Sequence, residues 1–190
     1  MIKSAVVGVG SMGQHHARVY SELSRSELVA VVDADNDGAC SIDEKYDVPA
    51  YSDYERMLQE QRPEAVSVAV PIQLHEQVAA AALLSGAHVL IEKPLAATIE
   101  EGQRLIDLAY RLDRHLMVAH IVRFNPATQM LKQKLCEGAL GKIYQVVCRR
   151  IGPFPVRISD VGVVVDLASH DMDLMRFLLD ADPIHLFAET

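Results

Sequence analysis

Short apolar runs alternate with amphipathic stretches along the first 120 residues of the chain. Runs rich in Val, Ile, Leu and Ala that are bounded by polar residues are typical of buried strands. We expect such strands at about 5–9, 28–32, 49–51, 65–70, 87–91 and 116–119. Apolar residues at helical spacing predict helices at about 14–23, 35–46, 53–60, 74–85 and 98–112. This alternation predicts an α/β fold with a doubly wound parallel sheet of the Rossmann type.

Local signals mark several of the predicted helix ends. Ser52 or Asp53 stands where a side chain would cap the helix that follows. Thr98 and Glu101 have the spacing of a capping box. Gly86 stands where a glycine would end the preceding helix. These signals agree with the hydrophobic pattern.

The alternation stops near residue 121. Beyond it the pattern predicts a helix over 127–137, a strand over 142–150, a helix over 166–179 and a strand over 183–190. We therefore expect two domains, 1–120 and 121–190, the second of which begins an α+β domain. Two strands alone would leave a sheet edge and an apolar face without cover. We expect this second domain to be truncated, or to be completed by another subunit.

A glycine-rich turn over residues 8–13 lies between the first predicted strand and the first predicted helix. Such a turn lets the backbone approach a pyrophosphate at the helix N-terminus. The next strand ends in an acid at the distance expected for a carboxylate that binds the adenine ribose. The alternatives are a glycine-rich turn that binds no ligand and an acid that merely ends a strand. The order of strand, glycines, helix, strand and acid together favours a dinucleotide site. The residues concerned are Gly8, Gly10, Ser11, Met12, Gly13 and Asp33. Because a carboxylate repels a 2′-phosphate, Asp33 favours NAD over NADP.

Further candidates lie where other strands end, since ligands bind beyond the carboxyl ends of parallel strands. Pro71, His75, Glu92 and Lys93 are expected to line the cofactor site. Lys93 precedes a proline, which favours an extended conformation. Its ammonium group could polarise a hydroxyl or carbonyl oxygen and stabilise an alkoxide. The alternative is a strand-end lysine that reaches into solvent.

Asp166, His170 and Asp173 share one face of a predicted helix. A histidine beside a carboxylate is a common general base near neutral pH. The alternative is an exposed helix with incidental pairs.

Composition narrows the class of partner. The chain has 190 residues, a hydrophobic fraction of 50% and a net charge of −8, which argues against nucleic-acid binding. Residues 114–159 nevertheless contain eight Lys or Arg and one acid. This basic segment is explained either by an anionic small-molecule partner or by a solvated surface that is merely basic. The three cysteines lack metal-ligand spacing, and no apolar run suits a signal peptide or a membrane span. We expect a soluble, cytoplasmic protein without a metal.

Four motifs in this order resemble the Gfo/Idh/MocA family of NAD(P)-dependent oxidoreductases. They are Gly8-x-Gly10-x-x-Gly13, Glu92-Lys93-Pro94, Arg123-Phe124-Asn125-Pro126 and Asp166-x-x-x-His170-Asp171. The resemblance implies a Rossmann domain followed by a domain for substrate binding and oligomerisation. It also implies hydride exchange between nicotinamide and a carbinol of a sugar, cyclitol or sugar nucleotide. By the same resemblance Lys93 and His170 are the catalytic pair, and Asp166 supports His170.

The run from Arg149 to Arg157 is similar to a UDP-N-acetylglucosamine 3-dehydrogenase-like branch of the family. A diphosphate would require arginines, which suits the basic window. We expect Arg123, Asn125, Arg149 and Arg157 to bind the substrate, and the protein to form a homo-oligomer. Members of the family are usually longer, so a non-catalytic NAD-binding relative is one alternative. A family enzyme that acts on free sugar or inositol is another.

Overall fold

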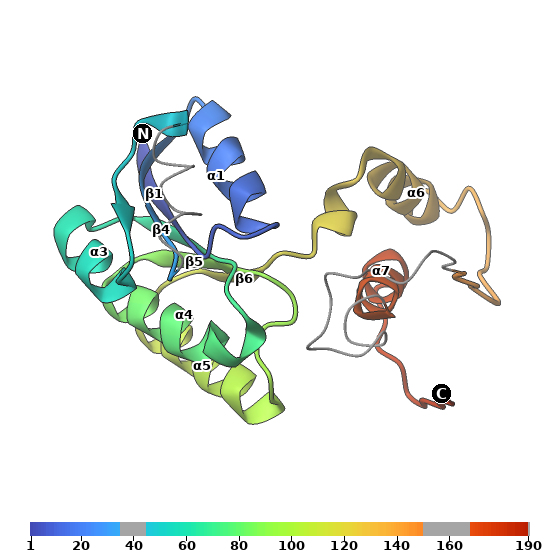
Figure 1. Ribbon diagram of the computed structural model, residues 1–190. Coiled ribbons are helices and arrows are strands. Elements are labelled where there is room, and N and C mark those ends of the chain that lie inside the picture. The colour runs from blue at the N-terminus through green and yellow to red at the C-terminus, as the bar shows by residue number, and fades with distance from the viewer. Residues whose placement is uncertain (35–44, 150–167, 190) are drawn as a thin grey trace. The chain divides into compact units, whose positions relative to one another are not determined.

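The computed structural model describes residues 1–34, 45–149 and 168–189 (Figure 1). The chain divides into two compact units, Met1–Ala119 and His120–Thr190. Most of the helix expected at 35–46 lies outside the described residues.

The first unit is built on a parallel sheet with the strand order β3-β2-β1-β4-β5-β6 (Figure 1). The strands are β1 (Ile2–Val7), β2 (Ser26–Val32), β3 (Ala50–Tyr51), β4 (Ala65–Val68), β5 (His88–Ile91) and β6 (Leu116–Val118). The order reverses beside β1, where β2 lies on one side and β4 on the other. In open α/β sheets this switch point is where ligands bind. The predicted Rossmann fold is confirmed.

The two faces of the sheet bury separate apolar clusters, because successive side chains of a strand point to opposite faces. Ala5 and Val7 of β1 belong to one cluster, and Val6 between them belongs to the other. The first cluster includes residues of α3 (Tyr54–Gln61), α4 (His75–Leu84) and α5 (Ile99–Arg111). The second includes Ala17 of α1 (Gly13–Glu22). Helices thus cover both faces, as a doubly wound fold requires.

The predicted helix caps form as expected in the first unit. The Asp53 carboxylate accepts hydrogen bonds from the amides of Glu55 and Arg56 at the start of α3. Thr98 and Glu101 form the complete capping box of α5. Gly86, just after α4, has φ of +94°, a conformation that favours glycine. None of the described helices combines the length and the apolar character that crossing a bilayer would require.

The described part of the second unit contains a short helix η2 (Ile121–Phe124) and two α-helices, α6 (Pro126–Cys136) and α7 (Ser169–Leu179). The strands expected at 142–150 and 183–190 are wrong as far as the described residues of those segments extend. A strand needs a neighbour to pair its backbone groups, and the hydrophobic pattern of a segment does not supply one. Their apolar side chains are accordingly exposed, with Tyr144 86% and Phe187 90% accessible.

Candidate functional site

The ends of four adjacent strands lie in one row across the sheet. Val7 of β1 is in register with Val32 of β2 and with Val68 of β4, and Val68 is in register with Ile91 of β5. The next residues along each strand are Gly8, Asp33, Ala69 and Glu92, listed in the order of the strands. The pairing continues past the strands, since the Gly8 amide donates to the Val32 carbonyl and the Glu92 amide to the Val68 carbonyl. The glycine-rich turn, Asp33 and the Glu92-Lys93 motif therefore begin at the same edge.

The glycine-rich turn packs so closely that side chains are excluded at two of its positions. A Cβ atom on Gly8 would lie 2.5 Å from the Ala69 carbonyl oxygen, and the φ of Gly8 is +86°. A Cβ atom on Gly13 would lie 1.7 Å from the Gly8 carbonyl oxygen. A Cβ atom on Gly10 would meet nothing within 4 Å. Gly8 and Gly13 thus shape the turn, whereas Gly10 leaves open space above it.

Asp33 is tied to the same turn. Its Oδ2 accepts a hydrogen bond from the Val9 amide at 2.7 Å, and the residue is half-buried. This contact holds the carboxylate beside the glycines. Because the acid is fixed at the switch point, it stands where the ribose of a dinucleotide would be expected.

These features fit a dinucleotide. The open space at Gly10 would admit a pyrophosphate, which residues 8–13 would hold at the start of α1. Asp33 would bind the adenine ribose. Ser11 and Met12 belong to this turn, and the Met12 carbonyl accepts from the His15 amide at 2.9 Å.

His75 is buried close to the strand ends. Its side chain is 2% exposed; Nδ1 lies 2.9 Å from the Pro94 carbonyl oxygen and Nε2 lies 3.0 Å from the Val70 carbonyl oxygen. The ring therefore lies between these two carbonyl groups, and its role at the cofactor site stays a prediction. The sequence placed His75 correctly near a strand end, but did not show that the ring turns inward. Pro71 precedes the short helix η1 (Ile72–Leu74) on this segment.

Glu92 and Lys93 follow β5 directly. The Glu92 side chain is 11% exposed; its Oε1 pairs with His16 Nε2 at 3.0 Å, and its Oε2 accepts from the Lys93 amide at 3.2 Å. Lys93 is half-buried, and its peptide bond to Pro94 is cis. Burial raises the pKa of Glu92 most strongly, but the hydrogen bonds from His16 and from the Lys93 amide, together with the charge of the Lys93 side chain, leave it below its ordinary value.

His16 was missed by the sequence analysis. It lies on α1, on the same turn as the buried Ala17, and its side chain is 12% exposed. Histidine on the inner side of an amphipathic helix is a signal for a buried polar contact, but it does not identify the partner. The Glu92 contact spans 76 positions of the sequence.

In the second unit, Arg123 is paired with Asp173. The guanidinium group donates from Nε to Oδ2 at 2.8 Å and from Nη2 to Oδ1 at 2.5 Å. Asp173 is 7% exposed, and its hydrogen bond raises the pKa of Arg123 above the ordinary value. His120 Nε2 lies 3.5 Å from the same carboxylate. Asp173 thus forms an ion pair with Arg123. This pair uses two of the guanidinium nitrogens of Arg123, a residue that was expected to bind the substrate.

The remaining predicted residues of the second unit have varied settings. Asn125 caps α6, where its Oδ1 accepts from the Ala127 amide at 2.9 Å. His170 lies in the first turn of α7 and is half-buried, and Arg149 is exposed. Asp166 and Arg157 lie outside the described residues. Their roles stay predictions.

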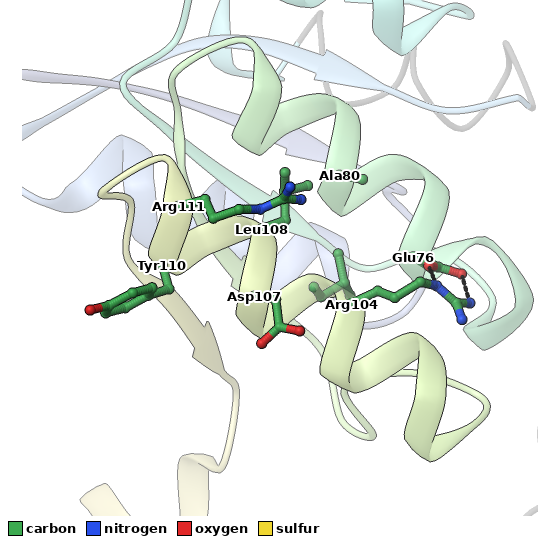
Figure 2. A pocket seen from close by; sticks show the side chains of 8 residues that line it. Glu76, Ala80, Arg104, Asp107, Leu108, Tyr110 and Arg111 are labelled. Atoms are coloured by element: carbon green, nitrogen blue, oxygen red, sulfur yellow. Dashed lines mark hydrogen bonds and ion pairs between the residues drawn. The ribbon is translucent and has the colours of Figure 1, made fainter.

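A separate groove of about 590 Å³ lies along α4 and α5 (Figure 2). Arg104 on its wall donates to both oxygens of Glu76, at 2.5 and 2.9 Å, and the side chain of Tyr110 points away from this pair. Among the residues that the structure describes, none of the predicted site residues lines the groove. We therefore place the candidate site at the strand ends.

Comparison with known families identifies the family of the chain. Residues 2–120 match the family described as "Oxidoreductase family, NAD-binding Rossmann fold", and residues 128–190 match the "GFO/IDH/MocA C-terminal domain". The chain belongs to the Gfo/Idh/MocA family. The resemblance noted in the motifs is thereby confirmed. The glycine-rich turn, Asp33 and the Glu92-Lys93 motif all fall within the NAD-binding match.

Similar proteins of the family act on different substrates. UDP-N-acetylglucosamine 3-dehydrogenase of Acidithiobacillus ferrooxidans is 34% identical over 98% of this chain and 57% of its own length. Inositol 2-dehydrogenase 2 of Saccharopolyspora erythraea is 32% identical over 97% of this chain and 56% of its own. The structure of scyllo-inositol dehydrogenase from Lactobacillus casei, solved with NAD(H) and scyllo-inositol, has a TM-score of 0.84 at 24% identity. It covers 94% of this chain and 56% of its own, and supports the fold alone. The chain thus spans little more than half the length of these relatives.

Proposed function

We propose that the chain is a dehydrogenase that transfers a hydride between NAD and a secondary alcohol of a sugar or sugar nucleotide. The observation that carries the proposal is the row of strand ends, because it brings the dinucleotide turn, Asp33 and the Glu92-Lys93 motif to one edge of the sheet. Membership of the Gfo/Idh/MocA family supports the reaction class.

The chain's own residues would divide the chemistry between them. A bound nicotinamide would supply the hydride acceptor or donor. Lys93 would hold the substrate oxygen and stabilise the negative charge that develops on it. His170 would take the hydroxyl proton during oxidation, and Asp166 would orient His170. In the reverse direction His170 would return that proton.

Asp33 makes NAD the proposed cofactor. Its carboxylate lies beside the glycine-rich turn, where it would accept hydrogen bonds from ribose hydroxyls. The same charge would repel the extra phosphate of NADP.

The substrate proposed is UDP-N-acetylglucosamine, oxidised at C3. Two features support it: the similarity to the Acidithiobacillus ferrooxidans enzyme and the basic segment 114–159. Arg149 and Arg157 are the proposed diphosphate ligands, because arginine forks match phosphate oxygens. We infer that residues 121–190 begin the substrate domain and that the protein works as a homo-oligomer.

A non-catalytic NAD-binding protein is the second candidate. NAD binding alone would account for the parallel sheet, the glycine-rich turn and the position of Asp33. Calorimetric NAD titration combined with an absorbance assay for reduced nicotinamide separates the two candidates. The assay should include UDP-N-acetylglucosamine, free sugars and inositols. Turnover supports the dehydrogenase, whereas NAD binding without turnover on any of them supports the second candidate.

A further inference from the structure

A buried polar network connects the helix of the glycine-rich turn to the proposed catalytic lysine. His16 on α1 pairs through Nε2 with Glu92 Oε1 at 3.0 Å and through Nδ1 with Ser67 Oγ at 3.1 Å. Ser67 on β4 is 0% exposed and lies 2.8 Å from the Tyr20 hydroxyl. Glu92 Oε2 accepts from the Lys93 amide. Three elements, α1, β4 and the segment after β5, thus share one chain of hydrogen bonds.

The donor and acceptor chemistry of these groups determines which atom donates in each hydrogen bond of the network. Glu92 has its pKa lowered, so it is a carboxylate at neutral pH and only accepts hydrogen bonds. Nε2 of His16 must therefore carry the proton that joins the ring to Glu92. A neutral ring would then accept at Nδ1 from Ser67, which would in turn accept from Tyr20. Every member of the network is satisfied in this arrangement.

We propose that His16 is a positioning residue for Lys93, acting by holding the Glu92 carboxylate against the Lys93 peptide. The proposal rests on the proposed role of Lys93 in catalysis. His16 lies three residues after Gly13, so the same residue also links the helix of the cofactor turn to the lysine.

Loss of His16 has a specific structural consequence. The Glu92 carboxylate is held from one side by His16 Nε2 and from the other by the Lys93 amide. Without the His16 contact, Glu92 no longer fixes the Lys93 peptide. The Lys93 side chain is then less ordered and more accessible to acylating reagents.

Two amide substitutions separate positioning from space filling. The amide nitrogen of glutamine can stand near Nε2 of histidine, whereas asparagine reaches only about as far as Nδ1. His16→Gln therefore keeps a donor for Glu92, and His16→Asn removes it. His15→Asn is the matched control, because His15 is the exposed neighbour on the same helix.

The test measures trace acetylation of Lys93 relative to the exposed Lys3 by mass spectrometry, in the ligand-free full chain. We expect His16→Asn to raise the relative rate by about threefold, because Lys93 is no longer fixed through the Glu92 carboxylate. His16→Gln and His15→Asn should stay near wild type. Equal rates for the two His16 variants, or an unchanged rate in His16→Asn, would overturn the proposal.

A second measurement needs no variant to fold. Nitrogen-15 spectra of the wild-type histidines at neutral pH should show a proton on Nε2 of His16. A ring protonated at Nδ1 alone is incompatible with the proposal. If the wild type turns over a substrate, His16→Asn should lower kcat about tenfold, with NAD affinity changing less than about twofold. If it turns nothing over, the proposed function fails, while the labelling and the spectra still decide the role of His16.

Discussion

Asp33, Glu92 and Lys93 show how single side chains at the strand ends are prepared for their proposed roles. Asp33 is held by the Val9 amide, and Glu92 by His16 and the Lys93 amide. Each carboxylate is thus fixed by the protein itself. Fixed groups need less reorganisation when a ligand binds, which favours both affinity and rate.

Replacing Lys93 tests the chemistry directly. Lys93→Met keeps the length of the side chain and removes its charge, so stabilisation of the developing alkoxide is lost. We expect turnover to fall by about 10²–10³-fold or more. NAD affinity, measured by calorimetry, should stay near wild type. Lys3→Met, at an exposed position, is the control; near-normal turnover in Lys93→Met would remove Lys93 from the mechanism.

Replacing Asp33 tests cofactor choice. Asp33→Ala should weaken NAD by about tenfold, the effect of losing a charged hydrogen-bond partner. Asp33→Asn keeps an oxygen that can accept from the Val9 amide but removes the repulsive charge. It should therefore bind NADP better than wild type does, in the same calorimetric titration. Unchanged affinities in both variants would contradict the ribose assignment.

The lowered pKa of Glu92 predicts that the stability of the fold depends on pH. Its pKa in the folded chain is below the ordinary 4.5. A lowered carboxyl pKa stabilises the folded state above the unfolded pKa, and this contribution is lost as the pH falls through the folded value. Urea unfolding between about pH 7 and about pH 3 should show wild type losing more stability than Glu92→Gln. The exposed Glu27→Gln should follow wild type, and parallel curves for Glu92→Gln would rule out the contribution.

At the scale of elements, the glycine-rich turn shows that glycines in one motif have different functions. Gly13→Ala would force a Cβ atom to 1.7 Å from the Gly8 carbonyl oxygen, whereas Gly10→Ala meets open space. We expect Gly13→Ala to destabilise the fold by about 1–3 kcal/mol or more. Gly10→Ala should unfold within about 0.5 kcal/mol of wild type but bind NAD more weakly. Denaturant unfolding and calorimetry check the two effects, and normal stability of Gly13→Ala would contradict the packing argument.

The helices and strands also show which features a local sequence pattern can predict. The caps at Asp53 and Thr98 and the period of the strands follow from neighbouring residues, and these predictions hold. The strands expected in the second unit do not form in the described residues. Hydrophobic alternation indicates which face of a segment could be buried. Pairing of its backbone groups requires a second strand from another part of the sequence or from another chain.

At the scale of the whole molecule, the two units should differ in how strongly their backbone amides are protected from hydrogen exchange. β1 and β4 lie inside a paired sheet, whereas 143–149 and 183–189 form no strand. Backbone amides without such pairing exchange with solvent through small local openings. Hydrogen exchange followed by mass spectrometry should therefore be fast in both segments and slow in the central strands. Slow exchange in 183–189 would show that a partner strand is present in solution.

The sequence by itself determined the Rossmann sheet, the glycine-rich turn and the position of Asp33. These features depend on local periodicity and on short spacings, which are visible in one dimension. It also placed Lys93 at a strand end, because residues following a buried strand in a parallel sheet share one edge.

Only the tertiary structure decided which polar side chains meet. His16 and Glu92 are 76 positions apart, and Arg123 and Asp173 are 50 apart. The inward turn of His75 likewise depends on the carbonyls of Val70 and Pro94. A buried polar group must find a partner in three dimensions, and its identity is fixed by how the elements pack rather than by the residues beside it.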